Sequence, residues 1–476
     1  MCDELRPSCT RCIKGRHACP GYKDEAEIIF RHWARPEVPV HVDVNDAEIE
    51  THALDIFMHE FVVEPADRAL SRGFLDGMPA LLSRAGPNSV LANAAKLMAL
   101  ACVANQQRRV ALLSRLDNDY CLLLRRFHES LAAEGDHVTL ASLYTAVLLG
   151  LYEIISETES SPKRQVTHVQ GVGAILVSGA SYLDWDAGAP IHELGIPLLL
   201  KLTTSDTRTH GILRASAHSP TPPLDAIMIS FWQFLNRVSA VLDESASSKG
   251  ELAQLRHEAE TLEQRFTLWS ASQNSERSAQ APTTAGVVSE QAAGRSAIPY
   301  CHSGAVDVYL DYYVATVWNT YRKSHIYILD VMMQIDARLD AQVDSTDLKA
   351  KAEDITTRVI ATIPFLLAHD VAEYLTQVRS GSSRVRANRP VGGLLLLHPL
   401  YCLATNPIVS LATRQYCARC LAWIGSHMGI GQAAVLARTL DGESLSARLN
   451  PDPRLPFQFM SESNNLIWAG MLLQGG

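Results

Sequence analysis

Apolar side chains recur every three or four residues through most of this chain, and that spacing constrains the fold more than any other feature. An α-helix turns once in 3.6 residues, so such a spacing places the apolar side chains along one face. In the clearest run the steps alternate between four and three residues, with one polar residue in the series. We expect a long buried helix here, with a coiled-coil dimer seam as the alternative. The run consists of Leu310, Val314, Val317, Tyr321, Ser324, Ile328, Val331 and Ile335.

Four further stretches have the same helical period, namely residues 90–104, 110–131, 140–155 and 348–368. Pro364 should kink or break the last of them near its end, because proline cannot donate the helical hydrogen bond. Alternating runs of Val, Ile and Thr bounded by turns, which would predict a sheet, are absent. The sequence therefore predicts an all-α fold.

Two polar stretches interrupt the helical pattern. Residues 203–223 are rich in Ser and Thr and end with three prolines, and residues 270–297 are rich in Ser, Ala, Gln and Thr without an aromatic residue. Both are expected to be exposed, disordered loops. We expect one packed core on both sides of the second loop, so residues 46–476 are predicted to form a single regulatory domain.

The composition excludes several classes of protein. With 476 residues, 47% of them hydrophobic and 20% charged, the chain can bury a large core. The net charge of −9 argues against a general binder of polyanions. No apolar run reaches the ~18–20 residues of a membrane span, and the first residues lack the apolar segment of a signal peptide. We therefore expect an intracellular chain without a membrane partner, in which thiols stay reduced.

The ten cysteines are distributed unevenly, because four of them lie within the first 19 residues. Cys2, Cys9, Cys12 and Cys19 have the spacing C-x6-C-x2-C-x6-C, and the residues between them cannot build an apolar core. Thiolates bound to Zn²⁺ can supply the missing stability of so small a segment. These four residues are therefore the candidate metal ligands, and zinc is the expected cofactor.

The segment from Cys2 to Tyr22 resembles the second half of a fungal Zn(2)-Cys(6) binuclear cluster. The resemblance implies that Cys2 matches the third cysteine of that family, Cys9 the bridging fourth, Cys12 the fifth and Cys19 the sixth. In the family, six cysteines hold two zinc ions, and a basic helix between the second and third cysteines enters the major groove of DNA. The resemblance thus implies a nuclear, zinc-dependent regulator of transcription.

This chain departs from the family pattern at its start. The first two cysteines of the family and its basic helix would lie before Met1, so the binuclear site is incomplete on the chain as given. Either the start codon is misassigned, or the protein is naturally short and its four thiolates collect around a single zinc ion. Direct reading of DNA bases should be impaired in either case on these residues alone.

The candidate zinc segment is basic, although the chain as a whole is acidic. Five basic residues against two acidic ones give residues 1–23 a net charge of +3. Arg11, Lys14 and Arg16 are the candidate contacts to DNA phosphates, which position a protein without reading the sequence. For each of them ordinary solvation is the alternative. Residues 24–45 are expected to form a linker, without the heptads of a dimerising coiled coil.

Several stretches of the helical body resemble the fungal-specific transcription factor domain, including that of regulators found beside secondary-metabolism genes. Each pattern is loose, but their order along the chain and their co-occurrence with the cysteines support the resemblance. It implies transcriptional co-regulators as partners besides DNA, and it is compatible with a homodimer. The stretches are residues 148–153, 168–176, 314–322, 398–401 and 428–433.

Other motifs in the body favour structural roles. The G-x-G-x-x-A at residues 429–434 follows a helical pattern, so a turn between helices is favoured over a dinucleotide site. Cys417 and Cys420 form a C-x2-C without a partner pair, which favours packing over redox chemistry or zinc. His168 is expected to make a polar contact with Glu153. A ligand pocket lined by Trp318, Tyr321 and Arg322 is the minority interpretation against plain core and surface.

No catalytic motif was found, so no catalytic residue is predicted. The sequence predicts a zinc-dependent, DNA-binding regulator of RNA polymerase II transcription in a fungus, with secondary metabolism as a candidate process. The first alternative is a truncated interaction protein that retains the helical domain but does not bind DNA. The second is an all-α enzyme, which would require convergent polar groups in a cavity.

Overall fold

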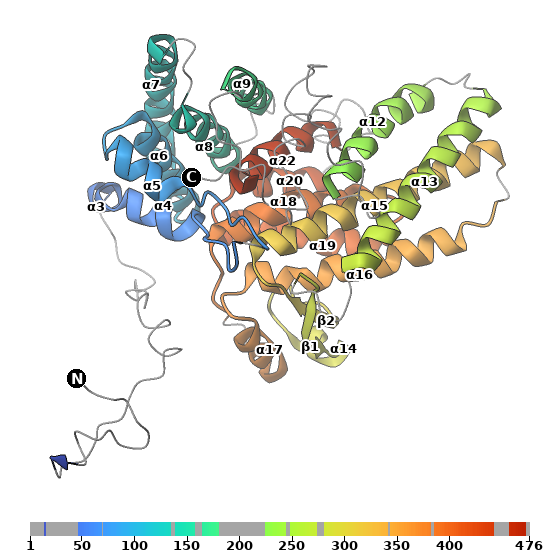
Figure 1. The fold of residues 1–476 in the computed structure, drawn as a ribbon. Helices are drawn as coiled ribbons and strands as arrows, with labels where there is room; N and C mark the ends of the chain where they lie inside the picture. The colour runs from blue at the N-terminus through green and yellow to red at the C-terminus, as the bar shows by residue number, and fades with distance from the viewer. Residues whose placement is uncertain are drawn as a thin grey trace. The chain divides into compact units, whose positions relative to one another are not determined.

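The structure is a computed structural model, and its residues divide by their contacts into two units, 1–48 and 49–476. The helical body described below belongs to the second unit (Figure 1). The predicted linker 24–45 and the predicted loop 203–223 lie outside the described residues. The structure describes residues 14–15, 46–68, 70–134, 139–157, 164–179, 224–243, 248–273, 280–340, 343–381, 385–441 and 457–472.

The described part of the chain is mostly helical, which confirms the predicted all-α class. Its one sheet among the described residues has two strands. The N-terminal helices are α3 (Asp46–Thr51), α4 (Ala53–Phe61), α5 (Met78–Ala85), α6 (Val90–Gln106), α7 (Val110–Glu134), α8 (Leu140–Ser156) and α9 (Arg164–Gly179).

Helices α6 and α8 form the core of this N-terminal block. The hydroxyl of Ser89 accepts the N–H of Ala92 at the start of α6, and Thr139 caps α8 in the same way. Such caps satisfy N–H groups that the first turn leaves unpaired. Helix α6 packs against α4, α7 and α8, and α8 is buried from Ser142 to Ile155.

The C-terminal block contains the longest helix described. The helices predicted at residues 90–104, 110–131, 140–155, 310–335 and 348–368 are all confirmed, with ends shifted by a few residues. The elements of this block are α12 (Leu224–Asp243), α13 (Lys249–Gln273), β1 (Thr283–Val288), α14 (Glu290–Arg295), β2 (Gly304–Val308), α15 (Tyr312–Leu339), α16 (Thr346–Leu367), α17 (Val371–Ser380), α18 (Pro390–Thr405), α19 (Leu411–His427), α20 (Gly431–Asp441) and α22 (Phe457–Leu472).

Helix α15 is the central helix of the C-terminal block. It begins after Asp311, whose carboxylate accepts the N–H of Val314 at 3.1 Å. It packs against α12, α13, α16 and α18, and every residue from Tyr313 to Met332 is buried. Helices of the same chain therefore enclose α15 from Tyr313 to Met332, which confirms the long buried helix rather than a dimer seam.

Helices α16 and α18 approach each other closely. A Cβ added to Gly392 of α18 would lie 2.0 Å from the carbonyl oxygen of Leu366, so a larger residue would push the helices apart. Pro364 stands in the last turn of α16, and the helix ends at Leu367. The predicted interruption by this proline therefore coincides with the end of the helix.

Helix α22 packs against helices of both blocks. It contacts α8, α9 and α18, and Figure 1 shows it between the N-terminal helices and α18 and α20. Gly150 on α8 lets the side chain of Leu466 approach, because a Cβ at that position would lie 2.7 Å from it. The N–H of Leu75 donates to the carbonyl of Gly470 at 2.6 Å.

The expectation of a disordered loop at residues 270–297 is wrong for its described residues. Residues 270–273 end α13, and residues 283–297 contain β1 and α14. β1 pairs antiparallel with β2, with an irregularity between Thr284 and Gly286, so the expected absence of strands is wrong here too.

A few buried apolar side chains explain why this polar stretch is ordered. Val288, Ala292 and Ile298 are at most 6% exposed, and β1 and β2 pack against α17 and α16. Burial against these helices outweighs the polar composition, which by itself favours disorder. None of the helices in the described ranges combines the length and the hydropathy of a membrane-spanning segment.

Candidate functional site

The predicted zinc ligands Cys2, Cys9, Cys12 and Cys19 lie outside the described residues, as do Arg11 and Arg16. Of the candidate phosphate contacts only Lys14 is described, and its side chain is exposed. Among the residues that the structure describes, no group of three or more His, Cys, Asp or Glu side chains could hold a metal ion. The zinc site and the phosphate contacts therefore remain predictions.

The C-x2-C on α19 has a packing role, as predicted. Cys417 and Cys420 are both fully buried, and burial raises the pKa of the Cys420 thiol to about 12. Burial also raises the pKa of Cys417 well above its usual value. Because the thiolate is the reactive form and the zinc ligand, both thiols are inert at neutral pH.

The glycines at residues 429–434 form a turn between helices, as predicted. Helix α19 ends at His427 and α20 begins at Gly431. Gly429 has a φ of 73°, and a Cβ there would lie 2.3 Å from the carbonyl oxygen of Cys102. Since a helix precedes this turn, the βαβ context of a dinucleotide fingerprint is missing.

His168 and Glu153 make the predicted polar contact, with 3.4 Å between Nε2 and Oε1. Tyr120 completes the cluster, because its hydroxyl donates to Glu153 at 2.6 Å and lies 2.7 Å from Nε2 of His168. The three residues belong to α7, α8 and α9. The cluster joins these helices through contacts between its own side chains, which is a structural role.

Trp318, Tyr321 and Arg322 do not line one ligand pocket. Trp318 is part of the wall of a pocket of about 10 Å³, next to Trp269 and Gln280. A volume of that size holds about one water molecule. All three side chains are at most 7% exposed, so the core interpretation is the one supported.

Arg322 is a buried cation whose partners are all neutral. Its Nη1 donates to the hydroxyl of Tyr309 at 2.7 Å, to Thr362 Oγ1 at 2.9 Å and to Asn319 Oδ1 at 3.3 Å. The guanidinium also lies 5.3 Å from the centroid of the Trp318 ring. These contacts join Tyr309, the residue after β2, to α15 and α16, and no carboxylate of the described residues takes part in them.

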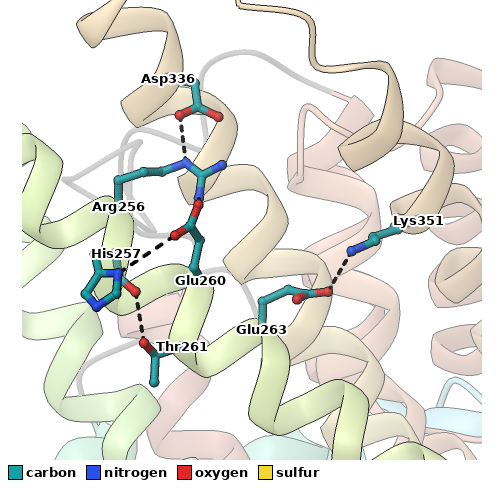
Figure 2. Close-up of polar contacts among 7 residues, drawn as sticks. All are labelled: Arg256, His257, Glu260, Thr261, Glu263, Asp336 and Lys351. Carbon is teal, nitrogen blue, oxygen red and sulfur yellow. Dashed lines mark hydrogen bonds and ion pairs between the residues drawn. The ribbon is translucent and has the colours of Figure 1, made fainter.

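Polar side chains of α13 contact α15 and α16, and Figure 2 shows two of these contacts, Glu263 with Lys351 of α16 and Arg256 with Asp336 of α15. Glu263 Oε1 lies 3.0 Å from Lys351 Nζ on α16 and 3.4 Å from His325 Nε2 on α15. The hydrogen bond with His325, followed by that with Lys351, lowers the pKa of Glu263 to about 2 against the opposing effect of burial. One carboxylate thus joins three helices.

A second set of ion pairs on α13 involves Arg256, which lies two turns before Glu263. Arg256 Nε donates to Asp336 Oδ1 on α15 at 2.7 Å, and its Nη1 donates to Glu260 at 2.8 Å (Figure 2). The side chains of Glu260 and Asp336 are both more exposed than that of Glu263, and each contacts the guanidinium of Arg256 directly. These contacts fix the orientation of α13 rather than forming a reactive centre.

The most unusual group in the described body is Lys323 on α15. Its side chain is buried, its Nζ donates to Asn464 Oδ1 on α22 at 3.0 Å, and it lies 5.3 Å from the centroid of the Trp468 ring. Burial lowers the pKa of this lysine to about 7. Perturbed groups of this kind mark functional sites more often than ordinary core positions do.

Two titratable side chains of α18 face Lys323. His398 and Cys402 are both buried one turn apart. Burial, and then the charge of Lys323, lower the pKa of His398 well below its usual value, so its imidazole is neutral. Burial raises the pKa of Cys402 to about 12 despite the nearby lysine, so this group is a thiol.

We define the Lys323 cluster as Lys323, His398, Cys402, Asn464 and Trp468. Sequence analysis missed it, because its members come from three helices that are far apart in the chain. One indication was available, since Arg322 and Lys323 are charged residues within a helix that is otherwise patterned for burial. Their partners could not be inferred from local spacing.

The comparisons with known proteins decide the family. No protein-family profile matches the chain. No solved structure matches it. The transcription factor dbaG of Emericella nidulans is 31% identical over 438 residues, which are 90% of this chain and 98% of the relative. The chain belongs to the family of this fungal transcription factor.

The similarity to this fungal transcription factor includes most of the helical body, because the alignment covers 90% of the chain. The fold and the polar clusters of α13, α15 and α22 therefore belong to a transcription factor. The more specific assignment to the Zn(2)-Cys(6) type remains a prediction.

Proposed function

We propose that this protein regulates RNA polymerase II transcription in the nucleus of a fungus. The observation that carries the proposal is the 31% identity to a transcription factor over 90% of the chain. A regulatory role also agrees with the chemistry of the body, whose buried polar groups join helices. Regulation of secondary-metabolism genes is the narrower process that we propose.

Zinc binding by the N-terminal cysteines is the second part of the proposal. Cys2, Cys9, Cys12 and Cys19 would supply thiolates, and the basic residues beside them would contact DNA phosphates. In this arrangement zinc replaces the apolar core that the segment lacks. The helical body would then bind co-regulators, and a homodimer is compatible with the same arrangement.

The zinc content of the purified full chain tests this part. We expect about one zinc ion per chain, lost in Cys9→Ser and Cys12→Ser. Cys121→Ser is the matched control, because Cys121 is an exposed cysteine of α7 and should leave the zinc content unchanged. Two zinc ions bound to these residues alone would refute the proposed ligand count, and no zinc would refute the site.

DNA binding by the same chain separates the regulator from the alternative of an interaction protein that does not bind DNA. With phosphate contacts only, we expect weak binding that falls steeply with salt and shows little sequence preference. Undetectable binding at low salt, together with an in-frame stop codon upstream of Met1 in the messenger RNA, would support the alternative. An upstream in-frame C-x2-C followed by basic residues would support the complete cluster.

A further inference from the structure

Among the residues that the structure describes, Lys323 has no anionic partner although it is buried. Its polar contacts are the amide oxygen of Asn464 and the ring of Trp468. The titratable groups that face it from α18, His398 and Cys402, are uncharged at neutral pH for the reasons given above. A buried ammonium without a counter-ion is costly, so this site is unfavourable for a charged lysine as it stands.

The two partners of Lys323 carry further hydrogen-bond donors that are not used. In the described part of the molecule, Asn464 Nδ2 and Trp468 Nε1 are buried and have no hydrogen-bond partner. The two residues are four positions apart on α22, so their side chains lie on the same face of that helix. Buried polar groups without partners are rare in folded proteins, and each one needs an explanation.

The unused groups share one chemical character. The ammonium of Lys323, the amide N–H groups of Asn464 and the indole N–H of Trp468 are all donors. They therefore fit a ligand that only accepts hydrogen bonds, and a carboxylate is such a group. A single cation matches a single negative charge better than the double charge of a phosphate.

We propose that the Lys323 cluster binds a small monocarboxylate between α15, α18 and α22. Lys323 provides the counter-charge, and Asn464 and Trp468 donate hydrogen bonds to the carboxylate oxygens. Two of the three donors belong to α22, so the bound ligand also holds α22 against α15. Carboxylate binding does not depend on the proposed role in transcription. Only the use of the bound carboxylate as a regulatory signal depends on that role.

Thermal unfolding of the full chain tests the proposal directly. The probes are acetate, propionate and benzoate at about 100 mM, compared with chloride and phosphate at equal ionic strength. We expect at least one carboxylate to raise Tm by a few degrees, because a ligand that binds only the folded state stabilises it. Binding should be tighter at pH 6 than at pH 8, since the ammonium form is required.

Two variants assign the response to the cluster. Lys323→Met keeps the length of the side chain and removes its charge, and it should abolish the carboxylate response. Lys349→Met makes the same change at an exposed lysine of α16 and should retain the response. Trp468→Phe keeps a ring and removes the N–H group, and it should weaken carboxylate binding about tenfold or more.

Several outcomes would overturn the proposal. They are the absence of any Tm response to the carboxylates, an equal response in Lys323→Met and the unmodified chain, or a response to phosphate that exceeds that to every carboxylate. Unchanged affinity in Trp468→Phe would remove Trp468 from the site. Loss or retention of DNA binding does not enter these measurements, so failure of the proposed function would leave the result readable.

Discussion

Two of the polar clusters that join helix α15 to its neighbours have opposite designs. On the side of α13 and α16, the carboxylate of Glu263 contacts His325 and has the ammonium of Lys351 as its counter-charge. On the side of α18 and α22, Lys323 meets an amide oxygen and an aromatic ring. The first cluster can stabilise the helix packing, whereas the second costs stability when its lysine is charged.

This comparison indicates that a buried charge with a counter-charge and a buried charge without one have different roles on the same helix. The α13 contacts satisfy one another within the chain, and they do not depend on anything else. The Lys323 cluster leaves donors unused, and unpaired buried groups persist only when the surrounding structure compensates for them or a ligand uses them. The predictions below test this contrast, starting with the largest expected effect.

Replacing Lys323 should stabilise the protein. Lys323→Met removes a buried, unpaired charge from an apolar site and is expected to increase the free energy of unfolding by about 1–4 kcal/mol near pH 7. Chemical denaturation followed by circular dichroism measures the change. Lys349→Met, at an exposed position, should change stability by less than about 0.5 kcal/mol. A destabilised Lys323→Met variant would contradict the account of this cluster.

The gain from Lys323→Met should also depend on pH in a defined direction. The pKa of Lys323 is about 7 in the folded chain and near 10.5 when it is exposed, so the unfolded chain binds the extra proton between these values. The lysine therefore costs most stability at pH 7 and below, and the cost shrinks as pH rises toward 10. Unfolding measured at pH 6.5, 8 and 9 should show the advantage of the variant decreasing.

Replacing Glu263 should have the opposite sign and a smaller size. Glu263→Gln removes the carboxylate that joins α13, α15 and α16, and the free energy of unfolding should fall by about 1 kcal/mol at pH 7, since solvent screens Lys351. The pKa of Glu263 is lowered to about 2, so its contribution is present above pH 4.5 and is lost as pH falls toward 2. A difference between the two proteins that persists unchanged at pH 3 would contradict this account.

Lys351→Met should have the smallest effect of the series. The lysine is half exposed, so its ion pair with Glu263 is expected to contribute less than about 1 kcal/mol. A double-mutant cycle with Glu263→Gln measures the coupling directly. A coupling energy larger than the change in unfolding free energy of Lys323→Met would contradict the expectation that the Lys323 cluster has the larger effect on stability.

The helices could be predicted from the sequence because their determinants are local. The Leu and Ala spacing in α6 and α8 and the alternation in α15 define a buried face without knowledge of the partners. The strand β1 was missed because six residues in a polar stretch carry too little pattern. Its order comes from pairing with β2, from contact with α17 and from the burial of Val288. Tertiary context overrides local composition in such cases.

The candidate sites divide in the same way. The spacing of the N-terminal cysteines is a local pattern, so a zinc site can be predicted from the sequence and remains a prediction. The Lys323 cluster depends on Asn464, which is 141 residues away along the chain, and no periodicity connects the two. The contact between His168 and Glu153 was predicted and is confirmed, but the hydroxyl of Tyr120 that joins them was not foreseen.

The position of α22 has a consequence for how this protein is made. The N–H of Leu75 donates to the carbonyl of Gly470, and Leu466 fills the space left by Gly150. The N-terminal helices therefore cannot complete their packing until α22, which is synthesised late, is available. Contacts between such distant segments slow folding and leave apolar surface uncovered in the meantime. The nascent N-terminal helices should therefore be bound by chaperones on the ribosome until α22 emerges and covers their apolar surface.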